Sequence, residues 1–132
     1  MNHELNKGIL ITGATFCAIS VALGALGAHA LKSMVGPTSV STWELAAEYQ
    51  MYHGLAIFAV GLVYAHVNNK WIKTSYILFC LGIICFSGSL YLLALKSILS
   101  SGFIAIIGPI TPIGGLFFII AWITLIVGLV KK

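Results

Sequence analysis

Residues 41–54 read Ser41-Thr42-Trp43-Glu44-Leu45-Ala46-Ala47-Glu48-Tyr49-Gln50-Met51-Tyr52-His53-Gly54, and apolar sequence follows them without a break as far as Val67. Ser41 and Glu44 have the spacing of a capping box, in which each side chain satisfies a backbone N–H at a helix start. A helix over residues 42–67 would be roughly 39 Å long at 1.5 Å per residue. Because bilayer hydrocarbon is roughly 30 Å thick, its first turns are expected among headgroups or water.

The composition is that of an integral membrane protein. Of the 132 residues, 60% are hydrophobic and 8% are charged, whereas soluble proteins carry roughly 25% charged residues. The net charge of +4 comes from lysines scattered at the ends of apolar runs. A nucleic-acid-binding protein would show a basic stripe instead, so we expect no nucleic-acid partner.

Four apolar runs fill most of the chain, and each is long enough to cross a bilayer as a helix. The sequence therefore predicts an all-α integral membrane protein, a four-helix transmembrane bundle with up-down-up-down topology in one domain, 1–132. The expected spans are about 8–31, 42–67, 74–96 and 112–130. Ala28-His29-Ala30 mimics a signal-peptide cleavage site, but the apolar run before it exceeds the roughly 7–15 residues of a signal core. We expect that run to be retained as a span.

Small residues are frequent in the first span. Ala14, Ala18 and Ala22 recur every four residues, a spacing that lets a neighbouring helix backbone approach closely. We expect this stripe to pack against another helix of the same chain. The alternative is contact between two copies in a homo-oligomer.

The connection before the last span is unusually apolar, yet Gly102, Gly108 and Pro109 interrupt it. A short interfacial or re-entrant segment is expected there, with Thr111 and Pro112 as the N-cap and first residue of the last helix. We interpret the glycines and prolines as a structural turn that aims this helix and packs it tightly. The alternative is that the helix N-terminus holds an anionic or carbonyl group, such as a lipid headgroup. The turn residues are Gly108, Pro109, Pro112, Gly114 and Gly115.

The lysines predict the orientation. With four spans, the two termini and the connection between the second and third helices share one side, which holds five lysines against two on the other. Glu4 belongs to the first side, and Glu44 and Glu48 to the second. The positive-inside rule then places both termini in the cytoplasm.

This topology gathers polar residues of all four helices at the outer leaflet. Polar side chains at membrane depth are costly and normally face a bundle interior or a cavity, so we predict one polar or ligand-binding cluster near the outer boundary. Its candidate members are His29, Lys32, Glu44, Glu48, Gln50, His53, Ser87, Ser89, Tyr91 and Thr111.

The helical period divides the second span into two faces. Glu44 and Glu48 share one face with Tyr52 and are expected to pair with lysines, Lys32 or Lys96. Gln50 and His53 lie deeper on the opposite face and should point inward. For these two residues, hydrogen bonding between helices and handling of a ligand or proton are both open.

No cofactor, metal or catalytic group is predicted. A bis-histidine haem would need His29 and His53 to face each other, and His66 has no histidine partner within a span on its side. Cys17, Cys80 and Cys85 lack the spacing of a metal site, and we interpret them as packing residues. No nucleophile–base–acid set is recognisable.

Four motifs occur in a fixed order: Gly24-Ala25-Leu26-Gly27-Ala28-His29-Ala30-Leu31-Lys32, Trp43 with Tyr49-Gln50-Met51-Tyr52-His53-Gly54-Leu55-Ala56, Ser87-Gly88-Ser89-Leu90-Tyr91, and Gly108-Pro109-Ile110-Thr111-Pro112-Ile113-Gly114-Gly115. This set resembles the small four-span membrane family called domain of unknown function 423, with YgdD- and YwdK-type bacterial members and transmembrane protein 256 as a eukaryotic relative. The resemblance covers nearly the whole chain. It implies a multi-pass protein of the bacterial cytoplasmic (inner) membrane and implies no reaction.

We therefore expect a non-enzymatic accessory or scaffold protein that binds membrane lipids or a larger membrane complex through the polar cluster. The alternative is a binding or transport protein for a small molecule, such as a quinone, a lipid intermediate or a solute, that uses the same cluster. Transport is the weaker variant, because the sequence has no inverted repeat and no acid in mid-membrane.

Overall fold

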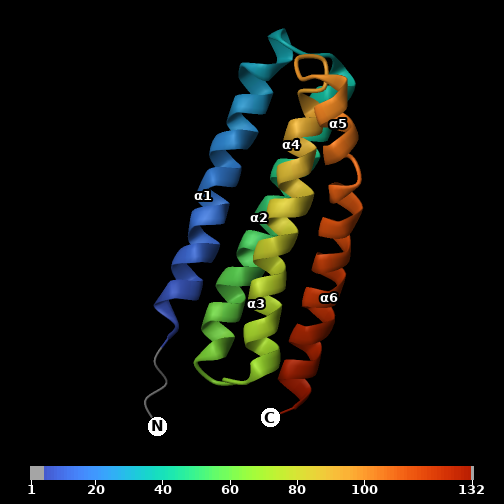
Figure 1. Cartoon of the computed structure of the whole chain (residues 1–132). Coiled ribbons are helices and arrows are strands. Elements are labelled where there is room, and N and C mark those ends of the chain that lie inside the picture. Colours follow the sequence, from blue (N-terminus) through green and yellow to red (C-terminus); the bar gives the residue numbers. More distant parts are fainter. Residues whose placement is uncertain (1–4, 132) are drawn as a thin grey trace.

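The protein is a bundle of long antiparallel helices (Figure 1). The computed structural model describes residues 5–131, so Glu4 and Lys132, which entered the charge count, lie outside the described residues. The helices α3, η2 and α4 continue one another, and the start of α1 and the end of α6 lie at the same end of the bundle. The expected all-α, up-down-up-down arrangement is confirmed. The elements are α1 (Lys7–His29), η1 (Leu31–Ser33), α2 (Pro37–Tyr64), α3 (Lys70–Gly82), the π-helical η2 (Ile83–Ser87), α4 (Gly88–Ala94), α5 (Ser101–Ile107) and α6 (Ile110–Val130).

Three helical stretches are long and apolar enough to cross a membrane: Lys7–Ser33, Lys70–Ala94 and Ser101–Val130. The 28-residue α2 is also long enough, but the polar side chains of its first half lower its apolarity. It lies at the centre of the packing: α1 covers one side, and α3, η2 and α4 cover another, while α6 packs chiefly on α3 and η2. The most polar long helix is thus the one that the others enclose most.

The helix α2 begins earlier than the capping-box interpretation placed it, and that interpretation is wrong. Gly36 is the N-cap and Pro37 the first helical residue, a position that suits proline because its fixed φ fits a helix and its missing N–H needs no partner. Ser41 lies inside the helix, where its hydroxyl donates to the Pro37 carbonyl at 3.2 Å. The helix ends at Tyr64, short of Val67.

The helix α6 also begins earlier than expected. Its N-cap is Pro109, so Thr111 and Pro112 lie within its first turn and the predicted capping role of Thr111 is wrong. The apolar connection contains α5, whose N-cap Ser100 accepts a hydrogen bond from the backbone N–H of Phe103. Figure 1 shows α5 continuing in the direction of α6 rather than re-entering the bundle.

The helices α1 and α2 approach each other through glycine. A Cβ added to Gly13 would lie 2.5 Å from the backbone nitrogen of Phe58 and 2.8 Å from the carbonyl oxygen of Gly54. The stripe Ala14, Ala18 and Ala22 is exposed instead, so the expectation that it packs within the chain is wrong. The contact needs backbone-to-backbone approach, and alanine is too large for it.

We expect Gly13→Ala to lower the free energy of unfolding by ~1–3 kcal/mol, because the methyl group would meet backbone atoms that cannot move aside. Gly24→Ala on the same helix is the matched control, since its Cβ would meet only the Ala47 methyl at 3.9 Å. Unfolding of the detergent-solubilised protein, followed by circular dichroism, measures both. Equal stability of the two variants would contradict the close-approach account.

Candidate functional site

The buried side chain of Gln50 joins three helices. Its amide nitrogen donates to the carbonyl oxygen of Phe16 in α1 at 2.9 Å, and its amide oxygen accepts from the Tyr91 hydroxyl in α4 at 2.9 Å. A backbone carbonyl can only accept a hydrogen bond, so it fixes which end of the amide faces α1. Of the two roles left open for Gln50, the structure shows hydrogen bonding between helices.

Tryptophan and serine side chains add further hydrogen bonds between α1 and α2. Trp43 donates from its indole nitrogen to the Leu23 carbonyl at 2.7 Å and packs edge-on against the Tyr91 ring, with centroids 4.7 Å apart. Ser20 of α1 donates to the Ala47 carbonyl at 2.6 Å. Neither Trp43 nor Ser20 is among the predicted site residues, although Trp43 belongs to one of the four motifs.

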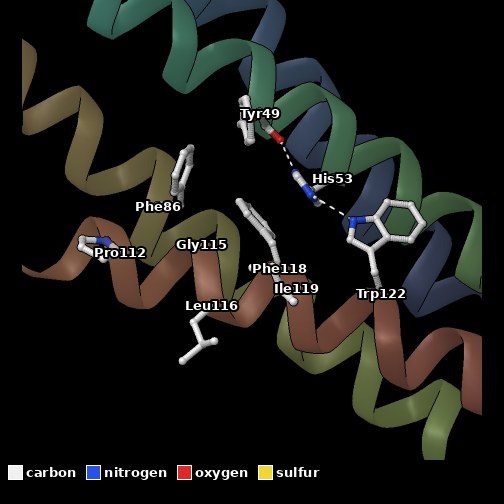
Figure 2. A pocket seen from close by; sticks show the side chains of 9 residues that line it. All are labelled: Tyr49, His53, Phe86, Pro112, Gly115, Leu116, Phe118, Ile119 and Trp122. Atoms are coloured by element: carbon white, nitrogen blue, oxygen red, sulfur yellow. Dashed lines mark hydrogen bonds between the residues drawn. The ribbon is translucent and has the colours of Figure 1, made fainter.

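Both ring nitrogens of His53 are occupied (Figure 2). Nδ1 lies 2.8 Å from the Tyr49 carbonyl oxygen, and Nε2 accepts from the Trp122 indole N–H at 3.3 Å. Because the carbonyl can only accept, Nδ1 carries the proton and the imidazole is neutral. The ring also stacks on Phe118, with centroids 3.5 Å apart. This arrangement leaves no free lone pair on the imidazole for an iron or another metal ion.

A second polar contact joins α4 to α6. Ser89 donates to the Phe86 carbonyl at 3.0 Å, which leaves Thr111 as the donor in the 2.5 Å contact between the Ser89 and Thr111 hydroxyls. Ser87, one turn below Tyr91, is fully buried, and its hydroxyl has no hydrogen-bond partner within residues 5–131. It lies in the π-helical segment η2.

The remaining candidates lie on the surface. His29, Lys32, Glu44 and Glu48 are exposed, so His29 does not face His53. Within residues 5–131, no ion pair joins either glutamate to a lysine, and Glu48 instead accepts a hydrogen bond from Tyr52, one turn along the same face. The predicted pairing with Lys32 or Lys96 is wrong: both acids are exposed, and neither lies within ion-pair distance of a lysine of residues 5–131.

The predicted turn residues differ in how closely they pack. Gly114 touches the backbone of η2 so closely that an added Cβ would lie 2.3 Å from the Phe86 nitrogen. Gly115 beside it has room, since its Cβ would meet only the Phe86 ring at 3.8 Å. Gly108 and Pro109 separate α5 from α6.

A cavity of about 500 Å³ lies between α2, η2 and α6 (Figure 2). Its volume is within the range of roughly 300–1,000 Å³ that ligand sites occupy. Along α6 it extends from Pro112 to Trp122, roughly 15 Å at 1.5 Å per residue. Sequence reasoning missed it, because an apolar lining gives no polar signal. It is lined by Tyr49, His53, Phe86, Pro112, Gly115, Leu116, Phe118, Ile119 and Trp122.

The cavity opens toward the outer surface of the bundle. Leu116 and Ile119 of α6 are 55% and 58% exposed, and they form part of its lining. Apolar side chains with this exposure face lipid in a membrane-embedded bundle. A molecule would therefore reach the cavity sideways, from the bilayer.

These features define a class: a small multi-pass helical membrane protein whose interior polar groups hold the helices together. Comparison with known sequences then identifies the family. The family model described as "Protein of unknown function (DUF423)" matches residues 23–115, and the chain belongs to this family of bacterial membrane proteins. The expected resemblance is confirmed.

Individual relatives align along nearly their whole length. The UPF0382 membrane protein SSP2132 of Staphylococcus saprophyticus is 43% identical over 127 residues, which cover 95% of this chain and 98% of that protein. The UPF0382 membrane protein YwdK of Bacillus subtilis is 37% identical over 126 residues, with 95% and 98% covered. No solved structure matches the chain significantly.

We expect Tyr91→Phe to lower the free energy of unfolding by ~1–3 kcal/mol, because it leaves the buried Gln50 amide oxygen without its donor. Tyr64→Phe is the control, since the Tyr64 hydroxyl makes no hydrogen bond within residues 5–131. Unfolding in detergent with increasing sodium dodecyl sulfate measures both variants.

A double-mutant cycle with Gln50→Leu measures the interaction free energy between the Tyr91 and Gln50 side chains. If the two side chains act together, the double variant loses less stability than the sum of the single variants. Simple additivity would show that the contact between Tyr91 and Gln50 contributes nothing of its own.

Proposed function

We propose that the protein is a non-enzymatic accessory protein of the bacterial cytoplasmic membrane that holds the apolar part of a membrane lipid in the cavity between α2, η2 and α6. The observation that carries the proposal is the contrast between the two kinds of interior. Gln50, His53 and Ser89 are engaged with protein partners, whereas the cavity is lined by aromatic and aliphatic side chains. The lining suits a hydrocarbon chain and offers little to a charged solute.

The place of the cavity supports a lipid ligand. Its mouth lies at the exposed rim of Leu116 and Ile119, so a chain could enter without leaving the hydrocarbon. Its Pro112 end lies near the first turn of α6, toward the end of the bundle where headgroups would lie. A lipid bound this way keeps its polar end at the boundary and its chain against the aromatic wall.

We further propose that the end of the bundle with the start of α1 and the end of α6 faces the cytoplasm. The described lysines at that end are Lys7, Lys70, Lys73 and Lys131, against Lys32 and Lys96 at the other. Lys70 and Lys131 also lie over the Trp71 ring, 5.5 and 5.1 Å from its centroid. Tryptophan and lysine together are typical of a membrane–water interface.

Gly115→Leu is expected to expel the lipid, because the new side chain would grow into the cavity while its Cβ makes only an ordinary contact with Phe86. Native mass spectrometry of the protein in mild detergent should show a several-fold loss of the lipid-bound species relative to the unsubstituted protein. Gly88→Leu is the matched control, since a Cβ at Gly88 has no neighbour within 4 Å.

Thermal unfolding of both variants shows whether the fold has survived. Equal lipid retention by folded Gly115→Leu and Gly88→Leu proteins would overturn the proposed function. The same spectra report whether copies of the chain, or a further membrane protein, remain associated.

The orientation has its own test. A reporter fused after the end of α6 should be active in the cytoplasm, and one inserted between Lys96 and Ser101 should be active on the other side. Replacing Lys70 and Lys73 with glutamine should weaken the bias and give a mixed population. Activity of both reporters in the same compartment would contradict the proposed topology.

A further inference from the structure

The cavity wall is an unbroken row of aromatic rings. Tyr49 and Phe86 lie with centroids 4.9 Å apart, and Phe86 and Phe118 follow at 5.5 Å. His53 stacks on Phe118, and Trp122 stands at the far end. A saturated chain needs only apolar surface, whereas a planar ring gains additional attraction from offset or edge-on contact with such faces.

One polar group of the wall remains available. The hydroxyl of Tyr49 makes no hydrogen bond within residues 5–131, although the Tyr49 ring lines the cavity. The side-chain nitrogens of the wall are engaged: Trp122 donates its indole N–H to His53 Nε2, and His53 Nδ1 donates to the Tyr49 carbonyl. A hydroxyl without a protein partner gains a hydrogen bond from any acceptor that a ligand brings.

Together these observations point to a more specific ligand than a saturated lipid. We infer that the cavity binds a lipid whose head is a planar conjugated ring with a carbonyl group, the chemistry of an isoprenoid quinone. The Tyr49 hydroxyl donates to the carbonyl, the ring lies along the aromatic row, and the tail leaves between Leu116 and Ile119. This inference rests on the proposed function, because it names the lipid class that the same cavity would take.

The proposed contact between Tyr49 and the ligand is binding without a chemical step. His53 stays neutral, with both nitrogens held by the protein, so no proton is passed to the ring through it. The selectivity comes from one hydroxyl and from ring stacking. Removing the hydroxyl should therefore change affinity for the carbonyl compound and leave purely apolar binding intact.

The test uses the full chain in phospholipid nanodiscs and two probes of the same shape. One is a naphthoquinone with a single isoprene unit, and the other is the corresponding naphthalene without carbonyl groups. Saturable quenching of tryptophan fluorescence reports the quinone, because Trp122 lines the cavity; competition against the quinone reports the naphthalene.

We expect the unsubstituted protein to bind the quinone more tightly than the naphthalene. Tyr49→Phe should weaken quinone binding roughly two- to tenfold, the loss of one hydrogen bond, and leave the naphthalene unchanged. Tyr64→Phe, which lies outside the cavity lining, should alter neither. Gly115→Leu should abolish saturable binding of both probes.

Two outcomes distinguish a failure of the quinone inference from a failure of the proposed lipid binding. If Gly115→Leu expels lipid but Tyr49→Phe leaves quinone affinity unchanged, the quinone inference fails while lipid binding in the cavity stands. If Gly115→Leu affects neither lipid nor quinone, the proposed function itself fails. Equal affinity of the unsubstituted protein for the two probes would also overturn the inference.

Discussion

A buried amide in a membrane protein has to find its partners within the protein, because hydrocarbon offers none. Gln50 meets this requirement by donating to a carbonyl of α1 and accepting from Tyr91 of α4. The rest of the architecture follows from that arrangement. The three elements must lie close enough to meet one side chain, so α2 takes the central place, and its face with Gln50 and His53 is turned away from lipid. Glycine allows α1 and α2 to come close enough, since Gly13 packs directly against the backbone of Phe58.

The same constraint accounts for the character of the cavity. His53 lies on the inward face of α2, and its imidazole is held by a carbonyl on one side and by Trp122 on the other. What remains between α2 and α6 is a space lined by rings and aliphatic chains, open toward the lipid-facing surface. The buried polar residues Gln50, His53 and Ser89, which suggest a reactive site in the sequence, therefore serve assembly. The surface available to a ligand is the apolar one beside them.

Long apolar runs and helical periodicity were enough to predict the helices, their alternation and the inward face of α2, because burial of apolar surface fixes those features locally. Three features depended on contacts that the sequence does not display. The helix α2 starts at Pro37 and not at the capping-box residues Ser41 and Glu44, because proline fits the first position of a helix. Ala14, Ala18 and Ala22 face outward, because Gly13 permits a closer approach than alanine can. Trp122 lies in an almost entirely apolar helix, so the sequence does not mark it as the partner of His53.

The central claim is that polar side chains hold the bundle together while the apolar cavity beside them receives a membrane lipid. A high-resolution structure of the protein in lipid nanodiscs tests this most directly. The account predicts elongated density in the cavity between Tyr49, Phe86 and Trp122, with Gln50 still bridging Phe16 and Tyr91. A cavity closed by its own side chains, or a Gln50 turned away from both partners toward a bound molecule, would contradict it.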